Sequence, residues 1–148
     1  AETVRNGVSV LLEQGLAEAK DNILVHDAAR CCLPAEALTR LLDEAGENDE
    51  GGILAIPVAD TLKRSDSSHH IDETVARAGL WQAQTPQLFQ TALLHRALSV
   101  DDLSEITDEA SAVEKLGIRP RLVQGDTRNL KLTLPQDEYI VRLLLKAV

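Results

Sequence analysis

The segment 52–58 constrains the fold more than any other part of the sequence. It reads Gly-Ile-Leu-Ala-Ile-Pro-Val, so its side chains are apolar on whichever face they lie. A strand that is apolar on both faces needs cover on both, which is typical of interior strands of an α/β sheet. The apolar triplet in 22–27 ends in His-Asp and predicts a second buried strand. Helical patterns separate the two, so we expect an α/β fold with a mostly parallel sheet in a single domain, residues 1–148.

Apolar residues at helical spacing mark the expected helices. These are a helix through Val4, Val8, Leu11 and Leu12 that stops at Gly15, one that opens at Pro34, one over 86–98 with Thr85 as N-cap, one over 107–116 with Thr107 as N-cap, and one from Pro135 whose Ile140, Val141, Leu143 and Leu144 face inward. Two further strands are expected over 121–124 and 129–133.

Residues 59–82 follow a different pattern. Two polar strands, over 60–64 and 69–77, flank the serine-rich turn 65–68 and predict a hairpin with little core face of its own. Such a hairpin should project as a β-arm, and it is stable only when it packs against something else, such as a second subunit. His69 and His70 resemble a metal-binding pair, but adjacent strand residues point to opposite faces, so we interpret them as exposed turn residues.

The composition excludes several classes of protein. Acidic residues outnumber basic ones by 24 to 15, a formal charge of −9 that argues against a general partner of nucleic acids or of anionic membranes. No apolar run approaches the ~20 residues that cross a bilayer. The adjacent Cys31 and Cys32 are expected to be free thiols, which is consistent with the reducing cytoplasm. The absence of Met indicates a processed chain or a piece of a longer one.

A few polar residues could carry chemistry. Asp27 follows a predicted strand, where a carboxylate can bind sugar hydroxyls or a divalent metal, and Arg30 can grip a phosphate after the small Ala28, which lets a ligand approach the backbone. Each has a structural alternative: Asp27 could cap a turn, and Arg30 could be a surface residue. The same holds for Thr61 beside two cations and for Arg77 in the hairpin, both of which could be solvated arm residues, and for Lys131, which could sit at a strand edge.

Taken in order, the motifs resemble one family. Residues 25–30 (Val-His-Asp-Ala-Ala-Arg), 57–64, 79–81 with 85–87, 107–111 and 129–131 (Asn-Leu-Lys) are similar to those of 2-C-methyl-D-erythritol 4-phosphate cytidylyltransferases. The resemblance implies a nucleotide-diphospho-sugar-transferase-like α/β fold and a homodimer joined through the β-arm. It also implies a reaction in which the phosphate of methylerythritol phosphate attacks the α-phosphate of CTP, with Mg²⁺, and pyrophosphate leaves.

The resemblance also implies roles for individual residues. The catalytic residues would be Asp27, Lys131 and Arg77, with Arg77 supplied by the arm of the other subunit. Substrate-binding residues would be Ala28, Arg30, Thr61, Thr85 and Thr107, and Thr3 would lie near the cytidine. Only Asp27 is a possible metal ligand. Cys31 stands where the family usually has proline, and 14–21 is longer than is common.

One departure bears on activity. The family's glycine-rich loop of the type Pro-Ala-Ala-Gly-x-Gly-x-Arg and the Pro-Lys motif after it, which wrap the CTP triphosphate, do not occur in this sequence. The chain therefore resembles the C-terminal two-thirds of the enzyme. Two alternatives stay open: a non-catalytic module for dimerisation and substrate binding, and a related nucleotidyltransferase that acts on another polyol phosphate.

Overall fold

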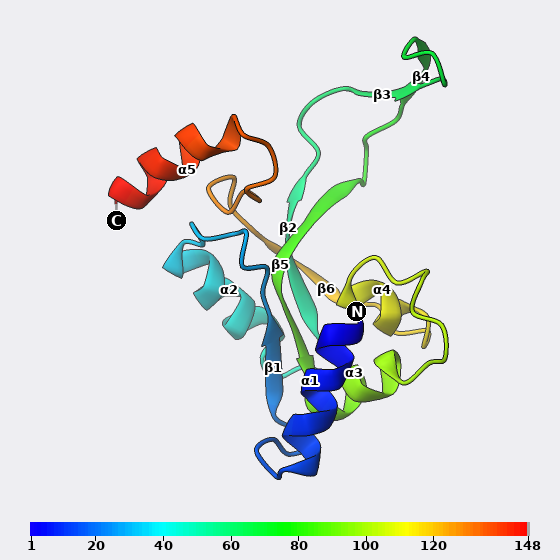
Figure 1. Cartoon of the computed structure of the whole chain (residues 1–148), viewed down its shortest axis with the longest axis vertical. Helices are drawn as coiled ribbons and strands as arrows, with labels where there is room; N and C mark the ends of the chain where they lie inside the picture. Colours follow the sequence, from blue (N-terminus) through cyan, green and yellow to red (C-terminus); the bar gives the residue numbers. More distant parts are fainter. Residues whose placement is uncertain (148) are drawn as a thin grey trace.

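A computed structural model describes residues 1–147 as a mixed sheet with helices on both faces and a projecting arm (Figure 1). The helices are α1 (Glu2–Glu13), α2 (Ala35–Ala45), α3 (Thr91–Leu98), α4 (Glu109–Glu114) and α5 (Asp137–Lys146). The strands are β1 (Asn22–Val25), β2 (Gly52–Pro57), β3 (Leu62–Ser65), β4 (Ile71–Val75), β5 (Trp81–Gln90) and β6 (Arg121–Gln124). None of these helices has the length and apolar character needed to span a bilayer.

The main sheet has the strand order β1-β5-β2-β6. β2 and β6 pair in parallel, whereas β5 pairs antiparallel with both β1 and β2. β1, β2 and β6 therefore run in one direction, and β5 lies between two of them in the other. The α/β class is confirmed, but the expected mostly parallel sheet is mixed in its pairing, because 81–90 enters the sheet as a long strand.

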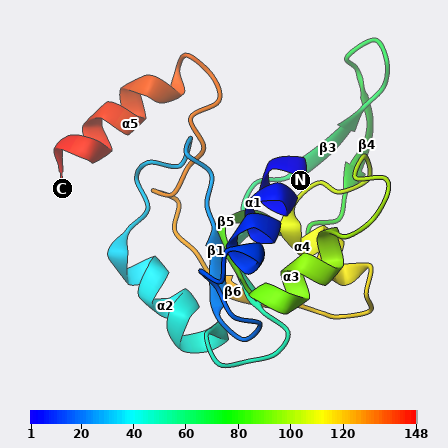
Figure 2. The same cartoon turned by 60° about the horizontal axis from the view of Figure 1, so that its bottom comes forward.

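The sheet is buried on both faces, as the apolar segment at β2 predicts. Ile53, Ala55 and Phe89 belong to a cluster with residues of α1, α3 and α4. Leu54 and Leu88 belong to a second cluster with residues of α2. Figures 1 and 2 show this layering, with α2 on one side of the sheet and α1, α3 and α4 on the other. Alternate residues of one strand thus stabilise two separate cores.

The expected helix over 86–98 is wrong in its first part. β5 continues to Gln90, and α3 begins only at Thr91. Thr85 is consequently a strand residue and not an N-cap. Leu88 and Phe89 are adjacent and both fully buried, which suits a strand between two covered faces better than one stripe of a helix.

Smaller corrections concern other segments. Asp108, and not Thr107, caps α4: its side chain accepts a hydrogen bond from the Ser111 amide at 2.8 Å within a reciprocal capping box. The segment 129–133 is irregular and not a strand, since its buried Asn129 side chain bonds to β5. Of the α5 residues expected to face inward, Val141 is buried and Leu144 is half-buried, but Ile140 is 47% and Leu143 51% exposed, since α5 lies beside the sheet layers.

The positions of the other expected helices and strands are confirmed. α1, β1, α2 and β6 lie where they were predicted to within a residue or two, and Gly15 takes a φ of 68° just past α1. β3 and β4 form a separate two-stranded sheet that extends away from the body (Figure 1). His69 and His70 are exposed in its turn.

Candidate active site

A cleft of about 570 Å³ opens beyond the C-terminal end of β1. Its walls come from the start of α1, the segment 25–30, the middle of β5, the residues before α4 and the irregular segment after β6. Ligands of α/β proteins bind preferentially beyond the carboxyl ends of such strands. The predicted residues that line this cleft are Asp27, Arg30, Thr85, Thr107 and Lys131.

A bulge in β5 shapes the floor of the cleft. Ala55 pairs with Ala83 and Ile53 pairs with Gln87, so the single residue Leu54 faces three residues of β5. The extra residues leave the regular ladder, and bulges of this kind re-aim side chains next to functional sites. Gln84 and Thr85 lie in this bulge and are both almost fully buried.

Asp27 and Arg30 lie at the two ends of one turn. The Arg30 amide donates to the Asp27 carbonyl at 3.0 Å, and the Arg30 Nε lies 3.4 Å from Asp27 Oδ2. A second guanidinium nitrogen of Arg30 donates to the Asn129 carbonyl at 2.7 Å. The Arg30 side chain is therefore only 13% exposed, while the Asp27 side chain is 39% exposed. Asp27 neutralises Arg30 only in part, because their separation is long and Asp27 is open to solvent.

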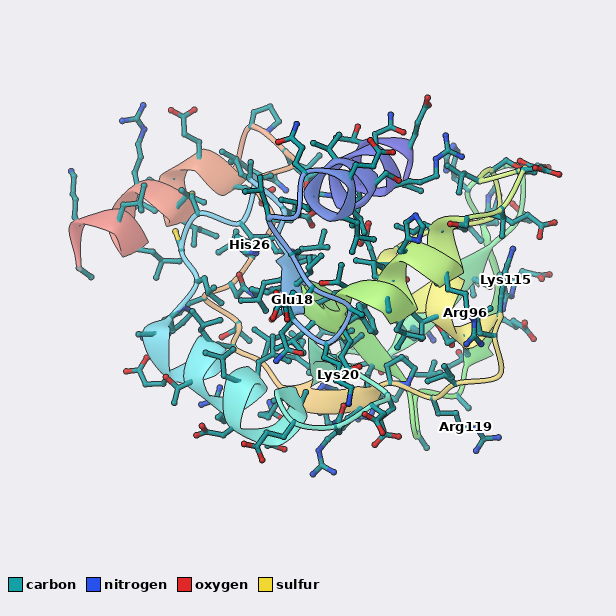
Figure 3. All side chains as sticks on the ribbon, turned by 90° about the horizontal axis from the view of Figure 1, so that it is seen from below. Glu18, Lys20, His26, Arg96, Lys115 and Arg119 are labelled. Carbon is teal, nitrogen blue, oxygen red and sulfur yellow. The ribbon has the colours of Figure 1, made fainter. Side chains whose placement is uncertain are left out.

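Thr85 joins this turn to β5. Its Oγ1 accepts a hydrogen bond from the Asp27 amide at 2.9 Å and lies 2.9 Å from Nδ1 of His26. The other ring nitrogen of His26 lies 2.9 Å from the Arg30 carbonyl. His26 therefore contacts the Arg30 end of the turn directly and the Asp27 end through Thr85. Figure 3 labels His26 where β1 ends, apart from Arg96, Lys115 and Arg119 on the α3–α4 side.

Two buried amides join the other walls to β5. Asn129 is fully buried, and its Nδ2 donates to Gln84 Oε1 at 3.1 Å and to the Thr85 carbonyl at 2.7 Å. Gln87 is 1% exposed; its Nε2 donates to Asp108 at 3.0 Å, and its Oε1 accepts from the Ala110 amide at 3.0 Å. Asn129 thus holds the segment that leads to Lys131, and Gln87 holds the start of α4 beside Thr107.

Lys131 is exposed and lines both the cleft and a smaller neighbouring hollow that Arg30 also lines. The amide of the next residue, Leu132, donates to the Ala29 carbonyl at 2.9 Å, which ties this segment to the turn between Asp27 and Arg30. Two cationic side chains therefore border the same space. Such a pair suits an anion, because a guanidinium offers several fixed donors and an ammonium offers a mobile charge.

The structure does not bring every predicted site residue to the cleft. Arg77 and Thr61 are exposed in the arm, where the Arg77 guanidinium donates to the Ala59 carbonyl. Ala28 is exposed in the turn and is not a lining residue, and Thr3 is exposed on α1 although its neighbours Ala1 and Val4 line the cleft. The roles expected for these four residues stay predictions.

Some residues of the site were not predicted from the sequence. His26, Gln84, Gln87 and Asn129 were seen only as parts of motifs, with no role of their own. One sequence signal indicates such residues: a polar side chain inside an apolar segment is expected to be buried and to need a hydrogen-bond partner there. For Gln87 that signal is masked, because 86–98 also fits a helix.

The carboxylates of the cleft do not form a protein-only metal site. No group of three or more His, Cys, Asp or Glu residues within 1–147 could hold a metal ion. Mg²⁺ is commonly held by one or two carboxylates together with substrate phosphates. The part-exposed carboxylate of Asp27, which lines the cleft together with the cationic Arg30 and Lys131, is a donor of the kind that such a shared site uses.

Comparison with known proteins gives one consistent family. Residues 1–147 match the profile of the 2-C-methyl-D-erythritol 4-phosphate cytidylyltransferase family. A protein of that name from Neisseria gonorrhoeae is 74% identical over all 148 residues, and one from Thiobacillus denitrificans is 52% identical over 98% of the chain. The chain spans 64% of the length of the first of these relatives and 63% of the second.

Solved structures agree. A crystal structure of a 4-diphosphocytidyl-2C-methyl-D-erythritol synthase superposes with a TM-score of 0.93 at 73% identity, covering 97% of this chain and 66% of that one. The Francisella tularensis cytidylyltransferase superposes with a TM-score of 0.84 at 32% identity, over 95% of this chain and 65% of its own. The mixed sheet with its covering helices is thus a known fold.

Proposed function

The chain belongs to the 2-C-methyl-D-erythritol 4-phosphate cytidylyltransferase family, and we propose that its protein joins methylerythritol phosphate to the cytidylyl group of CTP. A phosphate oxygen of the first substrate would attack the α-phosphorus of CTP, the bond to the bridging oxygen would break, and pyrophosphate would leave. The observation that supports this most is the convergence of Asp27, Arg30 and Lys131 in one cleft at the end of β1.

Each of these residues has a part in the proposed reaction. Arg30, held by Asp27 and the Asn129 carbonyl, presents its remaining N–H groups to the substrate phosphate. Lys131 offsets the negative charge that gathers as the two phosphates approach, so that catalysis consists mainly of positioning and charge stabilisation. Asp27 accepts hydrogen bonds from polyol hydroxyls, and Thr85 and Thr107 border the same pocket.

Mg²⁺ is part of this proposal. When bound, it would neutralise phosphate charge, with Asp27 as the protein oxygen ligand in this chain. Thr3, which is exposed on α1 and precedes the cleft residue Val4 in the sequence, is proposed to lie near the cytidine.

We also propose that the arm joins two copies of the protein. β3 and β4 form an isolated hairpin whose residues are almost all exposed, and an isolated two-stranded hairpin is marginally stable. A second copy would cover the arm and receive Arg77 and Thr61 near its substrate phosphate. Ala28 would contact substrate through its backbone. We place the protein in the cytoplasm, where adjacent free cysteines are kept reduced.

The test is an assay of the full gene product that contains this chain, with CTP, Mg²⁺ and methylerythritol phosphate. We expect release of pyrophosphate, and a loss of at least ~100-fold in kcat/KM for Lys131→Ala, since that change removes about 3 kcal/mol of charge stabilisation. Lys115→Ala is the matched control, because Lys115 pairs with Glu105 outside the cleft. Turnover of ribitol phosphate but not of methylerythritol phosphate would contradict the proposed substrate, and no pyrophosphate release from any polyol phosphate would contradict the proposed activity.

A further inference from the structure

The His26 ring lies between two oxygen atoms that come from different parts of the site. Its Nε2 lies 2.9 Å from the Arg30 carbonyl oxygen, and its Nδ1 lies 2.9 Å from the Thr85 hydroxyl oxygen. Thr85 is 7% exposed, so its hydroxyl has little access to water. A buried hydroxyl needs its hydrogen-bonding capacity met within the protein.

The chemistry of these partners fixes the direction of each hydrogen bond. A carbonyl oxygen only accepts, so the proton of the neutral ring is on Nε2, and Nδ1 carries a lone pair. The Thr85 hydroxyl must then donate to Nδ1, and its oxygen is free to accept from the Asp27 amide at 2.9 Å. One continuous chain results: the Asp27 amide donates to Thr85, Thr85 donates to His26, and His26 donates to the Arg30 carbonyl.

This series of hydrogen bonds forms a closed ring with the backbone of the turn 27–30, which carries Asp27 and Arg30. The turn itself has one internal bond, from the Arg30 amide to the Asp27 carbonyl at 3.0 Å. His26 and Thr85 hold the turn from the opposite side, and they attach it to the bulge of β5. The distance between the Asp27 carboxylate and the Arg30 guanidinium therefore depends on the orientation of the His26 ring.

We propose that His26 is a positioning residue, which holds Asp27 and Arg30 in their working separation through this one-directional chain of hydrogen bonds across Thr85. The inference rests on the proposed function, because it concerns how the same cleft aligns a phosphorylated polyol. It assigns His26 no contact with the substrate.

Two conservative variants test separately the two hydrogen bonds that the His26 imidazole makes. In His26→Asn, the side-chain oxygen reaches the position of Nδ1 and keeps the Thr85 bond, but the Arg30 bond is lost. In His26→Gln, the amide nitrogen reaches the position of Nε2 and keeps the Arg30 bond, but the Thr85 bond is lost. His26→Phe loses both. We expect KM for methylerythritol phosphate to rise ~3- to 10-fold in each single-bond variant and further in His26→Phe, as the loss of one net hydrogen bond predicts. His95→Asn, on α3, is the control and should leave KM unchanged.

A second readout does not depend on turnover. In the full-length protein, ¹⁵N shifts of the His26 ring should show the proton on Nε2, and Thr85→Val should speed exchange of the Asp27 amide and shift Nδ1. Thr85→Ser should restore both. A proton on Nδ1, or unchanged amide exchange in Thr85→Val, would overturn the chain of bonds. Wild-type kinetics in His26→Phe would overturn its positioning role. Absence of turnover in the unmodified protein would instead reject the proposed function, and the spectra would still decide the inference.

Discussion

The buried side chain of Asn129 gives the sharpest test of how the site is held together. Its Nδ2 faces two acceptors, Gln84 Oε1 at 3.1 Å and the Thr85 carbonyl at 2.7 Å. Because a carbonyl only accepts, the amide nitrogen must be the group on that side. Asn129→Asp keeps the shape of the side chain but replaces this donor with an oxygen. Asn129→Ala removes the side chain altogether.

We expect the smaller change in shape, Asn129→Asp, to lower the stability more than Asn129→Ala does. Asn129→Ala loses two hydrogen bonds, about 1 kcal/mol each, and strands their acceptors, but it also removes Oδ1, which has no hydrogen-bond partner within 1–147. We expect a net cost of about 2 kcal/mol. Asn129→Asp loses the same bonds and adds oxygen–oxygen repulsion or a buried charge, for a total of about 4 kcal/mol. The isosteric change should therefore be the more damaging one.

Urea unfolding of the variants, with the midpoint and slope fitted together, measures these costs. At about 2–4 °C per kcal/mol for a protein of this size, Asn129→Asp should melt ~8–16 °C below the unsubstituted protein. Asn6→Asp, the same chemical change on the exposed face of α1, is the control and should stay within about 0.5 kcal/mol. If Asn129→Asp is as stable as Asn129→Ala, the orientation assigned to this amide is wrong.

Three further predictions concern stability. Gly51→Ala should cost about 3 kcal/mol in chemical unfolding, because Gly51 has a φ of 76° and a Cβ there would lie 2.6 Å from the Leu88 carbonyl oxygen. Phe89→Ala should cost about 3–5 kcal/mol, since Phe89 is fully buried. Hydrogen bonds from Arg128 lower the pKa of Asp126 to about 2, so the stability that this pair gives is present above pH ~4 and is lost as the pH falls toward 2. Asp126→Asn should flatten that part of a urea-midpoint profile, and an unchanged profile would contradict the assignment.

The sequence predicted the parts of the fold whose residues carry a local signal. The segment 52–58 is apolar on both faces, and β2 is buried on both faces for that reason. The polar hairpin is separate from the main sheet because it has no apolar face to contribute. β5 was missed because Gln-Leu-Phe-Gln fits either a helix or a strand over so short a length. Its strand state is decided by β1 and β2 on either side, which no local pattern contains.

The residues of the site also fall into those that a local sequence signal predicts and those that it does not. Asp27, Arg30 and Lys131 were predictable, because charged side chains at strand ends and in a family-like motif point to phosphate chemistry. His26, Gln87 and Asn129 were not, because their role is to join segments far apart in the chain. The bond from His26 to Thr85 spans 59 positions, and that from Asn129 to Gln84 spans 45. Sequence spacing gives no indication of such partners.

β5 is the element that makes one site out of these separate segments. Its residues Gln84, Thr85 and Gln87 bond, respectively, to Asn129, to the Asp27 amide, and to Asp108 before α4. If β5 were parallel to its neighbours, its own carboxyl end would lie at the cleft. Its middle residues would then only pair through their backbone with β1 and β2. As an antiparallel strand it crosses the cleft with a bulge, so its buried polar groups reach three of the cleft walls: the segment 25–30, the start of α4 and the segment after β6. Asp27 and Lys131 can therefore stay open to a ligand, because uncharged residues of β5 hold the segments that carry them.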